Sequence, residues 1–311
     1  MTTPGGGTEQ PFMSVVITVV DGGDVLRRFL DAMLGQIAAP TMELLLPFDA
    51  TAPAIGRLQA DYPRVRFIDM GAVPTVRPVS TAAGQHELYD RRRAAGLHQA
   101  RGTLIAILED RAPPRSDWAA TMTRLHAALP HGAIGGAIEC APADLLNWAF
   151  WACDFSRYGL PFESGPRAWI SDVNVCYKRR CLDMTRDIWN ERFNEAKVHW
   201  TLTERGETLY LTSEAVVDYR TPYRSLSGVL PERFHWGRLF GCVRARHVTL
   251  LRRLAFILTG PVIPFVLFVR HGREQRSLGN QGRFRAAARF MLPMLVAWTS
   301  GEVWGYVTRR P

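Results

Sequence analysis

Short apolar runs alternate with segments of helical spacing along the first third of the chain. Residues 14–20 read SVVITVV, a continuous β-branched run typical of a strand buried on both faces of a parallel sheet. Residues 24–36 then place apolar side chains three and four positions apart, as an amphipathic helix does. Strands that alternate with helices form a parallel sheet with right-handed crossovers. The pattern predicts strands over 14–20, 43–48, 64–69 and 103–108, with helices over 24–36, 54–62 and 87–101.

The alternation becomes less regular in the middle of the chain, up to residue 219. Helical and strand-like segments still follow one another, so the fold class stays α/β, with a mostly parallel sheet flanked by helices. The pattern here predicts helices over 117–129, 145–158 and 194–205, and strands over 133–138, 169–177, 208–211 and 215–219.

After residue 219 the chain becomes apolar and rich in arginine. Residues 220–311 hold 16 Arg against three Glu, a net charge of +13, whereas the first 219 residues have a net charge of −4. Residues 254–269 carry no charge, but 16 helical residues reach only about 24 Å, short of a hydrocarbon core of roughly 30 Å. Together with a second apolar stretch, 286–307, they predict a helical hairpin at a membrane interface. A two-pass hairpin, a cover over the first domain and an oligomer contact are the alternatives.

Composition limits the class of protein. A chain of 311 residues with 47% hydrophobic and 22% charged residues is neither disordered, collagen-like nor a coiled coil. The five cysteines form no C-x2-C pair, which argues against structural zinc and a disulfide framework. The start of the chain lacks a basic and apolar leader, so we expect the bulk of the chain to stay in the cytoplasm. We predict a flexible N-terminus over 1–12, a first domain over 13–220 and a membrane-associated helical region over 221–311.

Acidic residues follow the predicted strands, at the edge where open parallel sheets bind ligands. Asp21, Asp49 and the pair Glu109-Asp110 stand after three of these strands. No GxGxxG follows the first strand, and GxxxxGK[ST] and GxSxG are absent from the sequence. Dinucleotide, P-loop and serine-hydrolase chemistry therefore lose their main support. Capping of the following turns is the alternative interpretation for Asp49 and Asp110.

Five segments, in this order, resemble the family 2 glycosyltransferases, which are inverting sugar-nucleotide enzymes of GT-A fold. The segments are SVVITVV, ELLLPFDAT, RRRAAGLHQARGTLIAILED, NEAKVHWTLTERG and SEAVVDY, and they span residues 14–219. The resemblance implies a GT-A fold and the transfer of a sugar, with inversion, from a nucleotide-diphospho-sugar to an acceptor. It also implies a place in the synthesis of cell-surface polysaccharide or glycolipid.

The resemblance implies roles for individual residues. Asp49 stands where the family holds the nucleotide base, and Arg93 matches the family's Arg-Asn-x-Gly helix. Glu109 and Asp110 occupy the first two places of the Asp-x-Asp element, which contacts the ribose and the diphosphate-bound metal. Glu195 stands at the catalytic base, for which a solvated helix-start carboxylate is the alternative. Asp21 and Arg111 are further candidates for the nucleotide-sugar site, and Asp172, Asn174 and Trp151 for the acceptor region.

The reaction gives these residue types a chemical reason. Displacement of a nucleoside diphosphate needs a carboxylate that takes the proton from the attacking hydroxyl. It also needs positive charge on the departing diphosphate, commonly Mg2+ or Mn2+, for which Glu109 and Asp110 are the candidate ligands. Arg111 stands at the third place of the Asp-x-Asp element, and Tyr219 stands where the family has a histidine. We therefore expect turnover to depend less on metal than is usual for the fold, with Arg111 binding the diphosphate.

The arginine-rich tail indicates where the acceptor lies. Such a region suits the membrane interface, so we expect a lipid-linked or membrane acceptor at the cytoplasmic face of the inner membrane, with the protein peripheral or inserted as a hairpin. Nucleic acid is not an expected partner, because long aliphatic runs interrupt the arginines. A catalytically degenerate GT-A-like membrane scaffold is the alternative from another class. A nucleotidyltransferase is a third, but its Gly-rich loop after the first strand is absent. Core packing is the alternative for Trp151.

Overall fold

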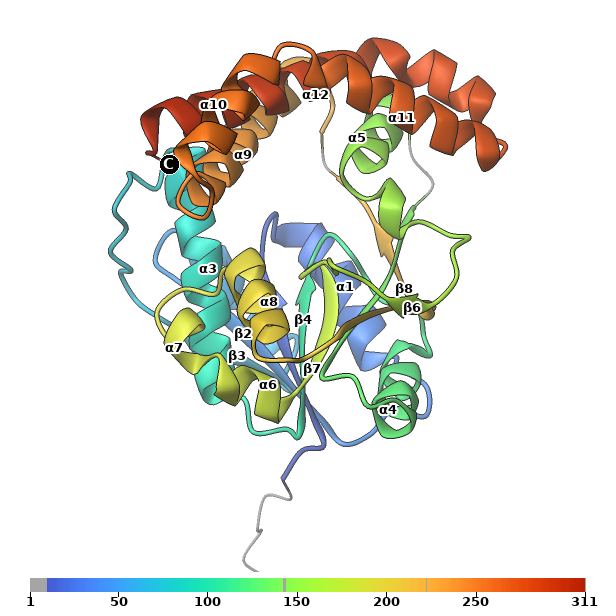
Figure 1. The fold of residues 1–311 in the computed structure, drawn as a ribbon. Coiled ribbons are helices and arrows are strands. Elements are labelled where there is room, and N and C mark those ends of the chain that lie inside the picture. Colours follow the sequence, from blue (N-terminus) through green and yellow to red (C-terminus); the bar gives the residue numbers. More distant parts are fainter. Residues whose placement is uncertain (1–9, 142–143, 222, 311) are drawn as a thin grey trace, which may run out of the picture. The chain divides into compact units, whose positions relative to one another are not determined.

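The computed structural model describes residues 10–141, 144–221 and 223–310. Most of the N-terminus predicted as flexible, residues 1–9, lies outside this description. Figure 1 labels the helices and strands. The strands are β1 (Met13–Thr18), β2 (Met42–Phe48), β3 (Val65–Asp69), β4 (Leu104–Glu109), β5 (Ala133–Cys140), β6 (Gly165–Pro166), β7 (Asn174–Lys178) and β8 (Leu209–Tyr219). The helices are α1 (Gly23–Leu34), α2 (Pro53–Gly56), η1 (Arg57–Ala60), α3 (Ala82–Gln99), α4 (Trp118–Ala128), α5 (Leu145–Asp154), η2 (Ser156–Tyr158), α6 (Arg179–Met184), α7 (Arg186–Trp189), α8 (Glu195–Glu204), α9 (Leu226–Arg244), α10 (Leu250–Thr259), α11 (Ile263–Ser277) and α12 (Gln281–Thr308).

The strands form one sheet of eight, in the order β3-β2-β1-β4-β7-β5-β8-β6. The strands β3, β2, β1 and β4 pair in parallel, and β7 runs antiparallel to both β4 and β5. The predicted α/β class, a sheet flanked by helices, is confirmed. Sequence patterning missed the two-residue strand β6 and divided β8, which is one strand of 11 residues, into two.

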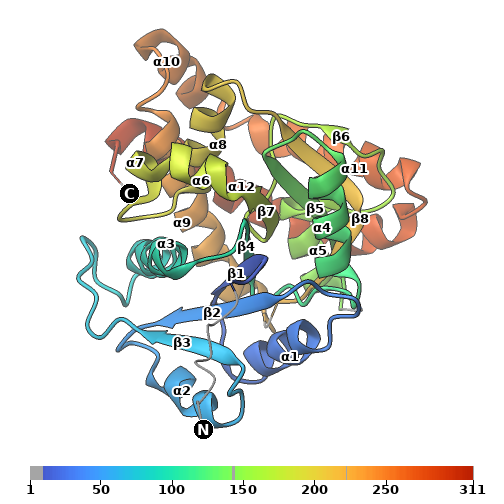
Figure 2. The same ribbon diagram turned by 90° about the horizontal axis from the view of Figure 1, so that it is seen from below.

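The order of the strands creates a switch point between β1 and β4. The chain moves from β1 to β2 and β3 on one side, then returns through α3 to β4 on the other side of β1. Right-handed crossovers place α1 and α3 on opposite faces of these strands, as Figure 2 shows. Such a reversal opens a crevice beyond the carboxyl ends of the two central strands.

Burial follows the predicted periodicities. All six residues of β1 are buried, as expected of a central strand covered on both faces. On α1 the four buried residues are spaced three, one and three positions apart, which is the predicted apolar face. They are Leu26, Phe29, Leu30 and Met33.

The chain divides into two compact units. The last segment of the second unit begins at Asp218, and this unit also includes two earlier segments that the sequence analysis placed in the first domain. One of these segments carries α5, which packs against α12 within the second unit. The first unit comprises the residues up to 74, 89–137 and 162–217, and the second comprises 75–88, 138–161 and the residues from 218 onward.

Glycines bring α9 and α12 into close contact in the second unit. A Cβ atom added at Gly237 would collide with the backbone oxygen of Trp298, and one at Gly301 would collide with that of Phe234. Gly305 faces α9 in the same way, four residues after Gly301. Small residues four apart let two helix backbones approach closely, a packing mode common among membrane helices.

The predicted apolar stretch over 254–269 is broken in the structure. It is divided between α10 and α11, which meet at an angle of 74°, and Pro261 lies in the break between them. A proline cannot donate a helical hydrogen bond, which accounts for the interruption. Among the described residues no single helix is long and apolar enough to cross a bilayer; α10 and α11 together meet the criteria of length and composition, but only as this bent pair.

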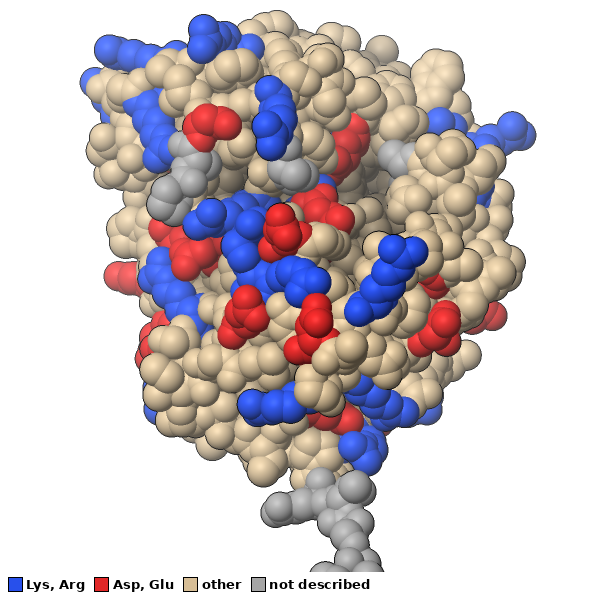
Figure 3. Space-filling model, turned by 180° about the vertical axis from the view of Figure 1, so that it is seen from behind, with Lys and Arg blue, Asp and Glu red and all other residues tan. Residues whose placement is uncertain are grey.

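The C-terminal helices combine apolar and basic surface. The four exposed large apolar residues of α10 lie on one helical face, and those of α11 and its preceding residue do the same. Over the face of the molecule drawn in Figure 3, Lys and Arg side chains are mixed with Asp and Glu. The exposed apolar residues are Leu250, Leu251, Leu254 and Leu258, followed by Val262, Phe265, Val266 and Val269.

Candidate functional site at the carboxyl edge of the sheet

Asp110 anchors the loop that follows β1. The backbone N–H of Val20 donates to its Oδ1 at 3.0 Å, and those of Asp21 and Gly22 donate to its Oδ2 at 3.2 and 2.8 Å. Burial raises the pKa of Asp110 to about 6, although the hydrogen bonds from Gly22 and Val20 oppose the rise. Both carboxylate oxygens therefore hold the β1–α1 loop against the end of β4.

Arg111 and Asp21 form a bidentate ion pair beside this anchor. The Arg111 Nε and Nη2 atoms donate to the two Asp21 oxygens at 2.8 and 2.7 Å. The two side chains are only 8% and 16% exposed. Fork-to-fork pairing of this kind fixes the plane of a guanidinium. The third place of the predicted Asp-x-Asp element thus carries an oriented positive charge.

Arg93 is the centre of a buried charge cluster. Arg93 lies on α3, and its guanidinium donates to Thr18 Oγ1 and Glu109 Oε1, both at 2.9 Å. Its Nη1 lies 2.8 Å from Asp172 Oδ2 and 3.7 Å from Asp90 Oδ1. Three carboxylates from three different segments therefore share one guanidinium, which is only 4% exposed.

The cluster shifts the ionisation of its members. Burial raises the pKa of Glu109 to about 7, because Arg93 only partly compensates the cost of a buried charge and Asp172 repels it. Burial acts to lower the pKa of Arg93, but the three carboxylates around it outweigh this and hold the pKa above its usual value. Arg93 is therefore charged at every physiological pH, whereas Glu109 titrates near neutrality.

Glu195 opens α8 with its carboxylate partly exposed. Asn194 caps the helix by accepting a hydrogen bond from the Lys197 N–H at 3.1 Å, which places Glu195 in the first turn. A carboxylate at this end of a helix is stabilised by the helix dipole. The side chain is 30% exposed, and its Oε1 lies 3.9 Å from Nδ1 of His199. Glu195 also interacts electrostatically with Arg93, so the helix start belongs to the same charge cluster.

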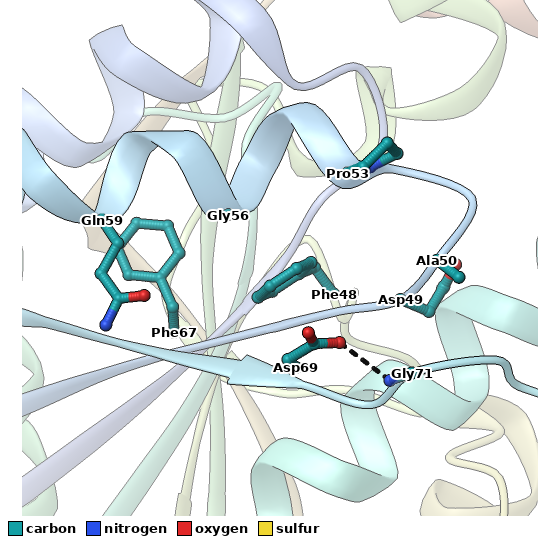
Figure 4. Close-up of a pocket in the computed structure, with 9 residues that line it drawn as sticks. All are labelled: Phe48, Asp49, Ala50, Pro53, Gly56, Gln59, Phe67, Asp69 and Gly71. Carbon is teal, nitrogen blue, oxygen red and sulfur yellow. Dashed lines mark hydrogen bonds between the residues drawn. The ribbon is translucent and has the colours of Figure 1, made fainter.

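A pocket of about 420 Å³ lies between the ends of β2 and β3, and Figure 4 draws its lining residues. Asp49 lines it and accepts hydrogen bonds from Arg92 Nε at 2.7 Å and from the N–H of Thr51 at 2.8 Å. Burial acts to raise the pKa of Asp49, but the hydrogen bonds from Arg92 and Thr51 outweigh it and lower the pKa. The pocket is lined by Phe48, Asp49, Ala50, Pro53, Gly56, Gln59, Phe67, Asp69 and Gly71.

Sequence reasoning missed two charged residues of this region. Asp69 ends β3 and lines the pocket, where its Oδ1 accepts a hydrogen bond from the Gly71 N–H at 2.8 Å. The rule that selected Asp49 at the end of its strand would have selected Asp69 as well. Arg92 precedes Arg93 in a run of three arginines, and no pattern in the sequence distinguishes which of these side chains meets which carboxylate.

The acceptor-region candidates have different surroundings. Asp172 joins Arg93, but the amide of Asn174 is buried and donates to the carbonyl oxygens of Ala137 and Ala215 at 2.9 and 3.0 Å. Its oxygen accepts from Trp118, so its role here is to join neighbouring parts of the sheet and α4. Trp151 lies in the second unit, 5% exposed, with its indole N–H on the Ile138 carbonyl. Tyr219 is buried in the same unit.

The expected metal ligands do not fit a divalent cation well. Both oxygens of Asp110 accept backbone N–H groups, and Glu109 is bound to Arg93. Over the part of the chain that the structure describes, no three His, Cys, Asp or Glu side chains come close enough to hold a metal ion. A hard cation such as Mg2+ seeks several free oxygen ligands, and the carboxylates here are already engaged.

No protein-family model matches the chain, and no curated protein sequence does. Two solved structures of S. aureus TarS, residues 1–349, align with this chain. The complex with UDP aligns with a TM-score of 0.47 and 11% sequence identity, over 93% of this chain and 90% of that one. The complex with UDP-GlcNAc aligns with a TM-score of 0.49, at the same identity and coverage.

Proposed function

We propose that the first unit is a GT-A glycosyltransferase that binds a nucleotide-diphospho-sugar and transfers its sugar, with inversion, to a hydroxyl of an acceptor. One observation carries the proposal. Two adjacent arginines of α3 link a nucleotide-sized pocket to a charge cluster: Arg92 holds Asp49 in the pocket, and Arg93 holds Glu109 and Asp172 at the switch point. A base in the pocket would direct its diphosphate toward the switch point, which is where open α/β sheets bind ligands.

Glu195 is the proposed general base. It is a partly exposed carboxylate at a helix start, and it interacts electrostatically with Arg93 at the centre of the cluster. In the reaction the acceptor oxygen forms a bond to the anomeric carbon while the bond from that carbon to the diphosphate oxygen breaks. Glu195 takes the hydroxyl proton, and the nucleoside diphosphate leaves on the opposite face. Attack opposite the leaving group inverts the anomeric centre.

Binding and base catalysis can be tested separately. A screen of the purified protein against UDP, GDP, dTDP and CMP sugars should raise its thermal midpoint with the matching donor, since a ligand that binds only the folded state stabilises it. Glu195→Gln should keep this shift but lower hydrolysis of the same donor by roughly 10²–10⁴-fold, because it loses the general base. Loss of hydrolysis together with loss of binding would point to damage of the site rather than of the base.

The pocket residue Asp69 provides a matched pair for the binding step. Its side chain is exposed, so Asp69→Asn should leave stability unchanged while reducing the donor-induced thermal shift. Asp61→Asn changes an exposed carboxylate outside the pocket, so it should leave the donor-induced thermal shift unchanged. If the wild-type protein neither binds nor hydrolyses any nucleotide sugar, the result favours a scaffold without turnover.

We propose that Arg111 neutralises the diphosphate in place of a divalent cation. The chain should then keep most of its donor hydrolysis in excess EDTA. Arg111→Met should lower hydrolysis at least tenfold both in EDTA and in Mn2+, because it removes the guanidinium while the neighbouring carboxylates are already engaged. Arg101→Met, at the opposite end of β4, is the control. Complete loss of wild-type hydrolysis in EDTA would refute the arginine proposal.

We propose that α10 and α11 bring the enzyme to the cytoplasmic face of the inner membrane, where a lipid-linked acceptor for polysaccharide or glycolipid synthesis would lie. Two observations support this placement. Each helix exposes an apolar face, and Arg252, Arg253, Arg270 and Arg273 lie on the same two helices. Apolar side chains can enter the headgroup region while arginines bind anionic lipids.

Flotation with vesicles tests the membrane proposal. The protein should float with vesicles that contain phosphatidylglycerol and float less with vesicles of phosphatidylcholine alone, an effect that salt weakens. Leu254→Asp with Leu258→Asp should reduce flotation at least tenfold, since two exposed apolar contacts become charged. Val76→Asp, also at an exposed apolar residue, should float like the wild type. Equal flotation of all three proteins would contradict the proposed surface.

A further inference from the structure

His199 lies one helical turn after Glu195 on α8, and its ring is completely buried. Its Nε2 is 2.7 Å from the hydroxyl of Tyr177 on β7, and its Nδ1 is 3.9 Å from Glu195 Oε1. Within the described part of the chain this Nδ1 has no hydrogen-bond partner. A buried nitrogen without a partner is destabilising, so its presence beside the proposed base requires an explanation.

The surroundings of His199 determine which of its nitrogens carries the proton. Burial lowers the pKa of His199 to about 3, so the ring is neutral at physiological pH and has one N–H. If Tyr177 donates to Nε2, the proton is on Nδ1 and faces the carboxylate. The other tautomer would place a nitrogen lone pair against a carboxylate oxygen, which is unfavourable. The ionised form of Glu195 therefore selects the tautomer with Nδ1–H.

We propose that His199, in the tautomer that Tyr177 stabilises, is a positioning residue that orients the Glu195 carboxylate for proton transfer. The inference rests on the proposed function of Glu195 as general base. A glutamate side chain has several rotatable bonds, and only one of its oxygens can face the acceptor. A hydrogen bond from His199 to Oε1 directs Oε2 toward the acceptor hydroxyl. The Nδ1–Oε1 separation of 3.9 Å is longer than a hydrogen bond, and the proposal requires it to shorten when substrate binds.

Other groups also interact electrostatically with Glu195. Arg93 acts on it from α3, and Tyr177 faces it from β7. Asp172 acts on the same tyrosine and is bound to Arg93. Variants at His199 and Tyr177 leave the Arg93–Asp172 pair in place. They therefore test the contact between His199 and Glu195 without changing the charges around Arg93.

The test uses the full-length chain and measures kcat and KM for hydrolysis of the nucleotide sugar that gives the largest thermal shift. His199→Leu and Tyr177→Phe should lower kcat roughly tenfold to hundredfold with little change in KM. The acid limb of the kcat profile should move to higher pH, because the ionised carboxylate loses a hydrogen bond. His199→Asn should recover part of kcat, since its amide nitrogen can take the place of Nδ1.

His126 provides the control. It is also a buried histidine of the first unit, with Nε2 3.1 Å from the Cys176 carbonyl and Nδ1 without a partner among the described residues. His126→Leu should change stability without moving the acid limb. If His199→Leu is poorly folded, Tyr177→Phe still tests the proposal, because it keeps the imidazole ring of His199 and removes only the hydroxyl that pairs with its Nε2.

Two kinds of failure are distinguishable. If Glu195→Gln abolishes hydrolysis while folded His199→Leu and Tyr177→Phe keep the kcat and acid limb of the wild type, the positioning role is refuted and the proposed base stands. If the wild type hydrolyses no donor, or Glu195→Gln hydrolyses as well as the wild type, the proposed function fails and the positioning role fails with it.

Discussion

Arg93→Met is expected to lower the free energy of unfolding of the first unit by about 3–5 kcal/mol. The guanidinium is buried and shared by Glu109, Asp172 and Asp90, so its removal leaves buried carboxylates without a counter-charge. Denaturation by urea, followed by tryptophan fluorescence, measures the loss. Arg124→Met is the matched control: it breaks an exposed ion pair with Glu214 and should cost less than about 1 kcal/mol.

The loss at Arg93 should depend on pH in a defined direction. The pKa of Glu109 is raised from 4.5 to about 7 in the folded chain, so the folded state binds this proton more tightly than the unfolded state. The cost of its charge is present in full above pH 7 and is relieved as the pH falls toward 4.5. Arg93→Met removes the main compensating charge, so its deficit should shrink between about pH 8 and about pH 5. A deficit that is equal at both values, or no larger than that of Arg124→Met, would contradict the shared-guanidinium account.

Gly301→Ala is expected to destabilise the packing of α9 against α12 in the second unit. The added Cβ meets the backbone oxygen of Phe234 and lies 2.9 Å from the Arg238 nitrogen, so a helix backbone must move rather than a flexible side chain. Overpacking of this kind costs about 1–3 kcal/mol, and the larger Gly301→Val should cost more. Hydrogen exchange of peptides from α9 and α12 should be faster in both variants, which localises the effect.

Gly282→Ala controls for the change of residue type on the same helix. A Cβ at Gly282 meets nothing within 4 Å, so this variant should be neutral or slightly stabilised by the better helix propensity of alanine. Equal hydrogen exchange in Gly301→Ala and Gly282→Ala would show that α9 and α12 do not pack through their glycines.

The pattern of apolar residues along the chain was sufficient to predict the first four strands. The apolar runs and helical spacings up to residue 110 locate β1 to β4 and the buried face of α1, because burial on one or both faces leaves a periodic trace. The later strands were less well placed. The strand predicted over 169–177 begins at Asn174, and this residue proved to be a hydrogen-bonded core amide. Pairing with β4 and β5 fixes its place, and such pairing leaves no periodic trace in a short segment.

The candidate site was predictable only in part. Strand ends identified Asp21, Asp49, Glu109 and Asp110, because a parallel sheet gathers its carboxyl ends at one edge. The direction in which each carboxylate points was not predictable. Asp110 had been expected to bind a metal, and the structure uses both of its oxygens for the loop after β1. That choice depends on the loop backbone, which brings three N–H groups to one carboxylate.

Asp110 and Arg111, which follow β4, make different kinds of contact. Asp110 holds the backbone of the β1–α1 loop, whereas the side chain of Arg111 meets another side chain, that of Asp21. Natural variation at position 111 can therefore change the charge presented at the switch point while the loop keeps its anchor. A change of residue at this one position would therefore alter the charge at this edge of the sheet, while the three backbone hydrogen bonds to Asp110 would still hold the loop in place.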